Sequence, residues 1–215
     1  MNNLYFKGLS TDNQELEKIR SMFQENDLNL SVVFDSYANL PLISKDRVNS
    51  TIDDGVRRCN PIGHNINLIC HSMGCNLGVL NAERSSKINK IVLISPEFGE
   101  YSKKEERKIE EEKVYPTIQR PFGEKGKRIS GATAKTIALF NRTKPWATLA
   151  IERVNVPVLI IYSKDDIFIP QEYLGHLADR KDNIEIEVID SKLHNPLTSI
   201  EHGSKTMSLI KKYLK

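Results

Sequence analysis

The sequence lacks the features that would mark a membrane, secreted or nucleic-acid-binding protein. Its longest apolar run, residues 156–162, contains a proline and is far too short to span a bilayer. The first eight residues have neither the basic stretch nor the longer apolar core of a secretion signal. The formal net charge is only +3, which gives no overall signature of nucleic-acid binding. We therefore expect a cytoplasmic protein with no membrane span and no nucleic-acid partner.

Cysteine is scarce as well. The chain has three cysteines, Cys59, Cys70 and Cys75, and an odd number without framework spacing argues against a disulfide scaffold. No second cysteine pair or histidine cluster accompanies Cys70 and Cys75, so no zinc site is expected. The three thiols are interpreted as small buried side chains in a reducing compartment.

Length and hydrophobic patterning together indicate the fold class. A chain of 215 residues suits one domain with one sizeable core. Strands are expected at residues 4–6, 30–34, 66–70, 91–94, 156–162 and 184–189, with helices over 11–25, 45–59, 73–84, 170–178 and 198–214. This alternation predicts an α/β fold, in which a mainly parallel sheet of about six strands is flanked by helices.

One connection is too long for this alternation of short strands and single helices. Residues 97–154 separate two predicted strands, and connections of that length usually hold structure of their own. Residues 101–113 carry opposite charges three and four apart, which favours a solvated helix. We predict a helical cap here, over a core made of residues 1–96 and 155–215. Phe140 and Trp146 are its expected substrate-binding side chains. Because the later part of the cap is cationic, an anionic substrate remains an alternative.

The turn around Ser72 is the most informative part of the sequence. An apolar strand runs into this serine, Gly74 follows, and a helical pattern begins. A serine at a sharp strand-to-helix turn is exposed at the carboxyl edge of the sheet, and the turn needs small residues two before and two after it. Gly74 meets that need, and Cys70 stands where glycine is usual. His71 is expected to be structural, with its side chain pointing away from Ser72. The alternative interpretation of Ser72 is a helix cap.

Two later loops supply partners for such a serine. Asp165 and Asp166 follow the predicted strand at 156–162, and a carboxylate there lies at the same sheet edge as Ser72. We assign the role of orienting an imidazole to Asp166, with Asp165 as the fallback and turn capping as the structural alternative. His194 follows the last predicted strand. The chain order serine, aspartate, histidine points to a catalytic triad.

These segments resemble the α/β-hydrolase family. Residues 70–74, Cys-His-Ser-Met-Gly, resemble its Gly-His-Ser-Met-Gly nucleophile turn, while residues 162–170 and 192–195 resemble its aspartate and histidine loops. The resemblance covers nearly the whole chain. It implies that the first strand here corresponds to the family's third.

The resemblance also locates an oxyanion hole. The family has His-Gly after its third strand, where this chain has Lys7 and Gly8. By position, the backbone N–H groups of Leu9 and Met73 would form the hole.

The activity implied by the resemblance is cleavage of carboxylic esters through an acyl-serine intermediate, without a metal or an organic cofactor. The substrate would be a small-molecule acyl ester or thioester. An acyl-thioesterase or acyltransferase with the same triad is the first alternative. An inactive hydrolase fold used as a binding module is the second, since a fold by itself does not establish a function.

Overall fold

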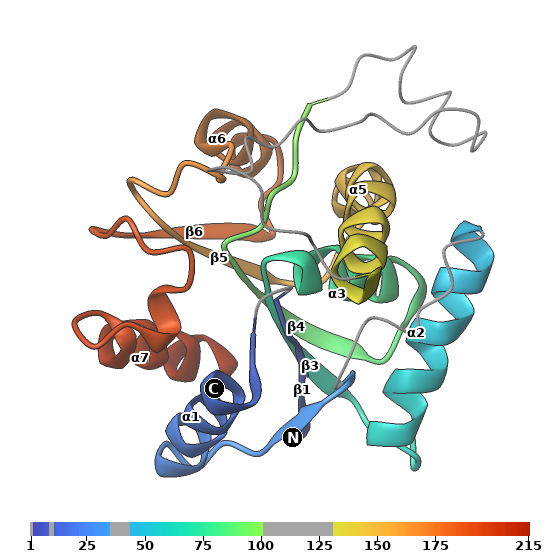
Figure 1. Cartoon of the computed structure of the whole chain (residues 1–215), viewed down its shortest axis with the longest axis horizontal. Coiled ribbons are helices and arrows are strands. Elements are labelled where there is room, and N and C mark those ends of the chain that lie inside the picture. Colours follow the sequence, from blue (N-terminus) through green and yellow to red (C-terminus); the bar gives the residue numbers. More distant parts are fainter. Residues whose placement is uncertain (1, 9–10, 35–43, 101–130) are drawn as a thin grey trace.

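The computed structural model describes residues 2–8, 11–34, 44–100 and 131–215. In this part of the chain, six parallel strands form one sheet in the order β2-β1-β3-β4-β5-β6 (Figure 1). Their bounds are β1 Asn2–Phe6, β2 Leu30–Val32, β3 Ile66–His71, β4 Ile88–Ile94, β5 Val158–Ser163 and β6 Ile184–Ile189. The predicted α/β fold with a parallel sheet is confirmed.

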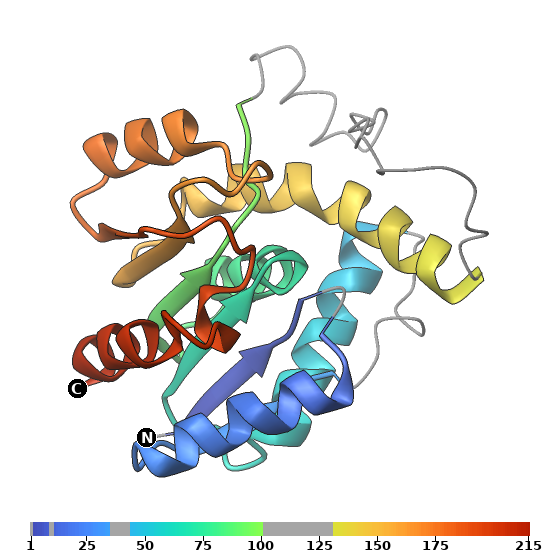
Figure 2. The ribbon, with the colours of Figure 1, turned by 60° about the vertical axis from the view of Figure 1, so that its left-hand side comes forward.

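Helices cover both faces of this sheet. They are α1 Asn13–Glu25, α2 Lys45–Cys59, α3 Met73–Arg84, α5 Gly131–Ile151, α6 Gln171–Arg180 and α7 Gly203–Leu214. Helices α1 and α7 pack on one face, whereas α2, α3, α5 and α6 pack on the other (Figures 1 and 2). None of the described helices combines the length and the apolar character needed to cross a bilayer.

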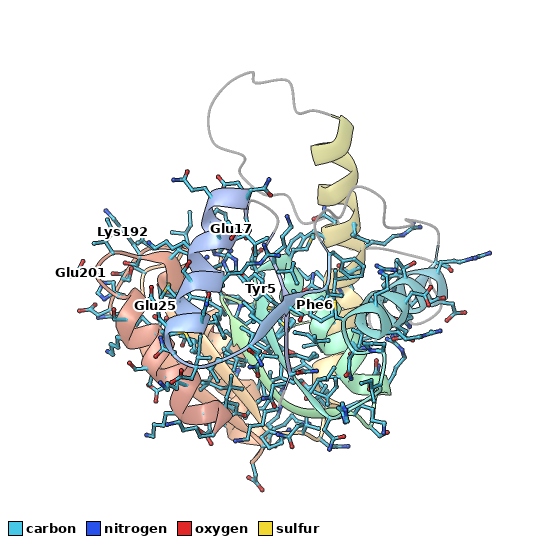
Figure 3. The ribbon with its side chains drawn as sticks, turned by 90° about the horizontal axis from the view of Figure 1, so that it is seen from below. Tyr5, Phe6, Glu17, Glu25, Lys192 and Glu201 are labelled. Carbon is cyan, nitrogen blue, oxygen red and sulfur yellow. The ribbon has the colours of Figure 1, made fainter. Side chains whose placement is uncertain are left out.

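Successive residues of each central strand enter opposite layers of the core. On β1, Tyr5 packs with α1 and Phe6 with α2, and Figure 3 shows these two side chains on opposite sides of the strand. On β3, Leu68 and Cys70 face the α3 layer, while Ile69 faces α1 and α7. Burial on both faces is the reason why these strands are continuous apolar runs in the sequence.

Buried amides connect three strands near the amino ends of the sheet. The Asn67 side chain donates to Asn3 Oδ1 at 3.0 Å, and Asn89 donates to Asn67 Oδ1 at 3.3 Å. Asn3 in turn donates to the carbonyl of Asn29 at 2.8 Å. Because buried polar groups need partners, a slip in the register of β1, β3 or β4 would leave several of these amides unpaired.

Some predicted helix boundaries were wrong. The first helix begins at Asn13 and not at residue 11, because the Asp12 carboxylate caps it by accepting from the backbone N–H of Glu15 at 2.8 Å. The last helix begins at Gly203, because Pro196–Thr198 forms a separate 3-10 turn before it.

The later part of the predicted cap belongs to the core. Residues 139–151 of α5 pack against α3, and Asn76 of α3 donates to Thr143 Oγ1 at 3.2 Å in a buried contact. Phe140 and Trp146, expected to line the substrate pocket, are each 1% exposed and lie in the main hydrophobic cluster. Residues 101–130 of the expected cap lie outside the described residues.

Candidate active site

Ser72 forms the turn between β3 and α3. Its φ of 51° and ψ of −121° lie where residues other than glycine are rarely found. A serine that begins a helix ordinarily accepts a backbone N–H of the first turn, but Ser72 makes no such bond. Its Oγ instead lies 2.9 Å from Nε2 of His194. The serine hydroxyl therefore faces an imidazole, which the helix-cap interpretation does not explain.

Close backbone packing holds this turn in place. The Ser72 N–H donates to the carbonyl of Ile94 on β4 at 2.9 Å, and the Cys75 N–H donates to the carbonyl of Ser72 at 2.9 Å. A Cβ at Gly74 would lie 2.1 Å from the carbonyl oxygen of Phe6. Helix α3 can thus begin against the end of β1 only because residue 74 has no side chain.

Cys70 fits at a position where the family has glycine because another glycine faces it. A Cβ at Gly78, the sixth residue of α3, would lie 2.2 Å from Cys70 Sγ. The thiol therefore occupies the space that a side chain at residue 78 would need. Burial raises the pKa of the Cys70 thiol well above its ordinary value, so this sulfur is an uncharged packing group.

Asp166 follows β5 and is 3% exposed. Its Oδ2 lies 2.7 Å from Nδ1 of His194, and its Oδ1 accepts from the Phe168 N–H at 3.0 Å. Asp165 is exposed, and its backbone N–H donates to Ser191. The structure thus brings Asp166, and not the fallback Asp165, to the imidazole.

Contacts with Ser163 and Phe168 hold the loop and the ring of His194 in place. Ser163 Oγ donates to the carbonyl of Leu193 at 2.6 Å, which ties this loop to the end of β5. The edge of the Phe168 ring packs on the imidazole, with the two ring centroids 5.5 Å apart. These contacts, together with Asp166, hold the imidazole between carboxylate and hydroxyl.

His71, expected to be structural, lies close to the site. Its ring centroid is 5.5 Å from that of His194, and its Nε2 is 3.4 Å from the carbonyl oxygen of His194. Burial, aided by the charge of His194, lowers the pKa of His71 to about 3. The ring is therefore neutral near pH 7, and its Nε2–H can donate to the His194 carbonyl.

The expected oxyanion hole is only partly within the described structure. Met73 is the first residue of α3 and directly follows Ser72, so its backbone N–H is among those that the first helical turn leaves without an intrahelical partner. Leu9, the other expected donor, lies outside the described residues.

The sequence analysis missed one group at the site. Glu97 follows β4, is 4% exposed, and places Oε1 3.8 Å from Nε2 of His194. The sequence holds a signal for it, because Glu97 comes three residues after a strand that neighbours the serine-bearing strand. It had been considered only as the first residue of the long connection.

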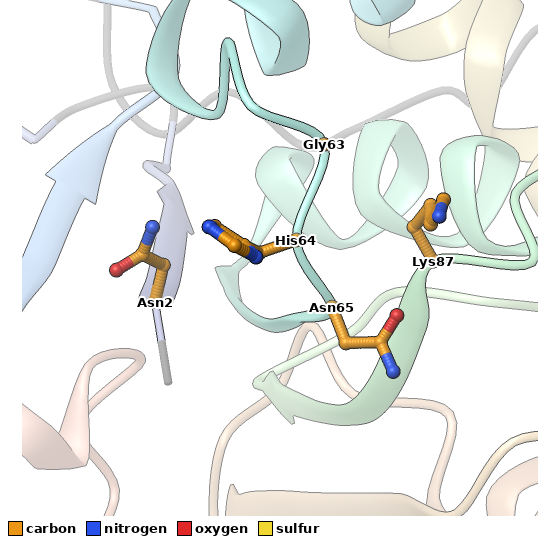
Figure 4. Close-up of a pocket in the computed structure, with 5 residues that line it drawn as sticks. All are labelled: Asn2, Gly63, His64, Asn65 and Lys87. Carbon is orange, nitrogen blue, oxygen red and sulfur yellow. The ribbon is translucent and has the colours of Figure 1, made fainter.

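A hollow lies at the opposite edge of the sheet. This open pocket of about 640 Å³ is lined by Asn2, Gly63, His64, Asn65 and Lys87, where β1, β3 and β4 begin (Figure 4). Ligands of open α/β sheets bind outside the carboxyl ends of the strands, where Ser72, Asp166 and His194 meet. In the described part of the chain, no group of three or more histidine, cysteine, aspartate or glutamate residues could hold a metal ion.

Comparisons with solved structures identify related folds. The monoacylglycerol lipase of Paleococcus ferrophilus is 18% identical with a TM-score of 0.68, over 99% of this chain and 93% of that one. A lipase-esterase related protein from Clostridium acetobutylicum is 17% identical with a TM-score of 0.61, over 98% and 93%. A Pyrococcus furiosus esterase is 12% identical with a TM-score of 0.61, over 99% and 80%. Likeness at these identities shows the fold.

The sequence itself matches a known family. A comparison with curated proteins finds no match. Residues 45–194, however, match the model of the family described as serine hydrolase, and this stretch includes Ser72, Asp166 and His194. The match covers more than half of the chain, and the sheet agrees with that of the lipases and esterases above. The chain therefore belongs to the serine hydrolase family, within the α/β-hydrolases.

Proposed function

We propose that this protein hydrolyses carboxylic esters, with Ser72 as nucleophile, His194 as general base and Asp166 as the group that orients the imidazole. The observation that carries the proposal is the continuous contact from Asp166 Oδ2 to His194 Nδ1, at 2.7 Å, and from His194 Nε2 to Ser72 Oγ, at 2.9 Å. The first distance is that of a hydrogen bond that orients the imidazole, and the second allows the Ser72 proton to pass to Nε2 without any rearrangement of the side chains.

In the first half of the proposed reaction, His194 Nε2 takes the proton of Ser72 as Oγ attacks the ester carbonyl. The Asp166 carboxylate accepts the Nδ1–H and stabilises the imidazolium that forms. The Met73 N–H, with Leu9 as the expected second donor, would stabilise the oxyanion of the tetrahedral intermediate. Collapse of this intermediate breaks the ester bond, and His194 returns the proton to the leaving alcohol.

In the second half, water replaces the alcohol. His194 takes a proton from the water as it attacks the acyl-serine, and then returns that proton to Ser72 Oγ while the carboxylic acid leaves. Every proton in this scheme moves through Nε2 of His194. The scheme needs only the groups named here and water.

Exposed apolar side chains beside the triad support an acyl substrate. Ile167 and Phe168 follow Asp166, and Leu193 precedes His194; these side chains are 85%, 39% and 46% exposed. Large apolar groups gathered at the edge of a site favour contact with an apolar ligand. An aliphatic acyl chain is such a ligand.

The test is turnover of p-nitrophenyl butyrate by the wild type and by Ser72→Ala. We expect the variant to unfold at the wild-type temperature and to lose activity by at least about 10³-fold. A folded Ser72→Ala protein that keeps most of the activity would falsify the nucleophile assignment. Butyryl-CoA, assayed in parallel with and without an alcohol acceptor, separates ester hydrolysis from thioester hydrolysis and acyl transfer.

A further inference from the structure

His194 has a carboxylate on each side of its ring. Asp166 Oδ2 lies 2.7 Å from Nδ1, and Glu97 Oε1 lies 3.8 Å from Nε2. The triad accounts for Asp166. Glu97 lies beside the nitrogen that would receive the Ser72 proton and pass it to the leaving group. Any group bonded near the leaving oxygen must therefore approach this second carboxylate.

The backbone that presents Glu97 is strained. Ser95 has a φ of 50°, and a proline follows it, which restricts the preceding residue to extended conformations. A serine in this region costs on the order of 1–3 kcal/mol. Among the described residues, the buried Ser95 hydroxyl has no hydrogen-bond partner that would explain the conformation. The Ser95 N–H donates to the carbonyl of Ile161 on β5 at 2.8 Å, which anchors the turn to the sheet. A strained turn next to a reactive group indicates a positional requirement on the residues that follow it, Glu97 among them.

The chain that leads to Glu97 passes the first turn of α3. The Cys75 thiol in that turn donates to the carbonyl of Ile94 at 3.4 Å, three residues before Glu97. The N-terminal end of a helix carries a partial positive charge, which makes it a favourable place for an anionic side chain. Glu97 is thus held at the site by its surroundings, at 4% exposure.

We propose that Glu97 is a specificity-determining residue that selects esters whose leaving alcohol carries an electropositive group, a cation or a hydroxyl hydrogen, close to the ester oxygen. This inference rests on the proposed ester hydrolysis. As His194 Nε2 donates its proton to the leaving oxygen, a substituent one or two carbon atoms away lies within contact of Glu97 Oε1. A positive or hydrogen-bond-donating substituent gains a charge-assisted interaction there, and an anionic substituent is repelled.

The experiment compares two pairs of butyrate esters that differ in the leaving group and little in size. Butyrylcholine and 3,3-dimethylbutyl butyrate differ in charge, whereas 2-hydroxyethyl butyrate and propyl butyrate differ in a hydroxyl. We expect the wild type to favour at least one electropositive ester over its partner by about 10-fold or more in kcat/KM. A hydrogen bond to a charged group typically contributes a factor of about this size. Glu97→Gln, which keeps the shape of the side chain, should bring the ratio of kcat/KM within the preferred pair to about 1, whatever its effect on the absolute rates.

Each outcome has a definite meaning. If the folded wild type hydrolyses the members of both pairs equally well, the inference is wrong while the proposed function stands. Equal loss on all four esters in Glu97→Gln would assign the residue to orientation of His194 and would also overturn the inference. If the wild type hydrolyses no ester and does not react with a fluorophosphonate, the proposed function fails and the inference fails with it. The comparison within the wild type requires no variant to fold.

Discussion

Two neighbouring strands of this protein end in the same unusual way and lead to different structures. Ser72 after β3 and Ser95 after β4 both have a φ close to 50°, and both are buried. At Ser72 the chain turns directly into α3, and the hydroxyl contacts His194. At Ser95 the chain continues through Pro96 to Glu97, and it is the carboxylate that approaches the same imidazole nitrogen.

The comparison indicates that a serine with a positive φ at the end of a strand can position two different functional groups. At the first corner the strain aims the serine's own hydroxyl, whereas at the second it aims a side chain two residues later. His194 Nε2 lies between the two, 2.9 Å from Ser72 Oγ and 3.8 Å from Glu97 Oε1. The account predicts a nucleophile at the first corner and a selectivity group at the second.

The largest effect on activity is expected from Asp166, which orients the imidazole that lies near both Ser72 and Glu97. Asp166→Asn should lower kcat by about 10³- to 10⁴-fold, because the amide no longer accepts the Nδ1–H that fixes the reactive tautomer. Asp165→Asn is the matched control, since Asp165 is exposed, and it should change kcat less than about 3-fold. Steady-state kinetics on p-nitrophenyl butyrate give both values. The reverse order of effects would transfer the orienting role to Asp165.

The packing behind the Ser72 corner gives the next largest effect. Gly78→Ala places a Cβ 2.2 Å from Cys70 Sγ and should destabilise the protein by about 1–3 kcal/mol through overpacking. Cys70→Ala removes that sulfur, and the remaining Cys70 Cβ would lie 3.5 Å away, an ordinary contact. Urea unfolding of both single variants and of the double variant should show a favourable coupling of at least about 1 kcal/mol. Additive effects would mean that the cysteine does not compensate for the glycine.

A smaller effect concerns pH, because only the Ser72 corner is preceded by a titratable residue. His71 has a folded-state pKa of about 3, below its ordinary value near 6.5, so the unfolded chain takes up a proton first as the pH falls. Stability from the neutral ring is therefore fully present above pH 6.5 and is lost between pH 6.5 and 3. We expect His71→Gln to reduce the slope of unfolding free energy between pH 6 and 4.5 by up to about 1.4 kcal/mol per pH unit. His64→Gln, at an exposed position, is the control for the loss of an imidazole.

The smallest effect is expected from relief of strain at the second corner. Ser95→Gly should stabilise the protein by about 0.5–1 kcal/mol, because glycine adopts a positive φ at little cost. Ser95→Ala keeps the strain and should not stabilise. Thermal unfolding of the two variants makes the comparison. Equal stability of Ser95→Gly and Ser95→Ala would show that the corner stores no strain.

Much of the fold was predictable because most strands and helices have a recognisable hydrophobic pattern in their own residues. The central strands are buried on both faces and form continuous apolar runs, whereas the edge strand β6 alternates apolar and acidic residues, and both patterns are visible in the sequence. The bounds of helix α5 were not predicted, since residues 97–154 were expected to be a helical cap but only residues 101–113 were assigned to a particular helix. Phe140 and Trp146 were assigned to a pocket because the sequence does not reveal that α5 packs on α3.

The site was predictable to the extent that its residues follow strands in a recognisable order. Ser72, Asp166 and His194 were identified in this way, and the structure brings all three together. Glu97 was missed because its position depends on the strained turn at Ser95. The residue types at this turn do not predict a positive φ. The compensation between Cys70 and Gly78 was missed for a similar reason, as it depends on how α3 crosses β3.

Covalent labelling with a small fluorophosphonate, located by peptide mass spectrometry, tests the central claim most directly. The two corners carry serines of similar φ 23 positions apart in the chain, and of these two Ser72 contacts an imidazole. The account predicts a single adduct on Ser72 and none on the Ser72→Ala variant. An adduct on Ser95 or on another serine, or labelling of Ser72→Ala at the wild-type rate, would contradict it.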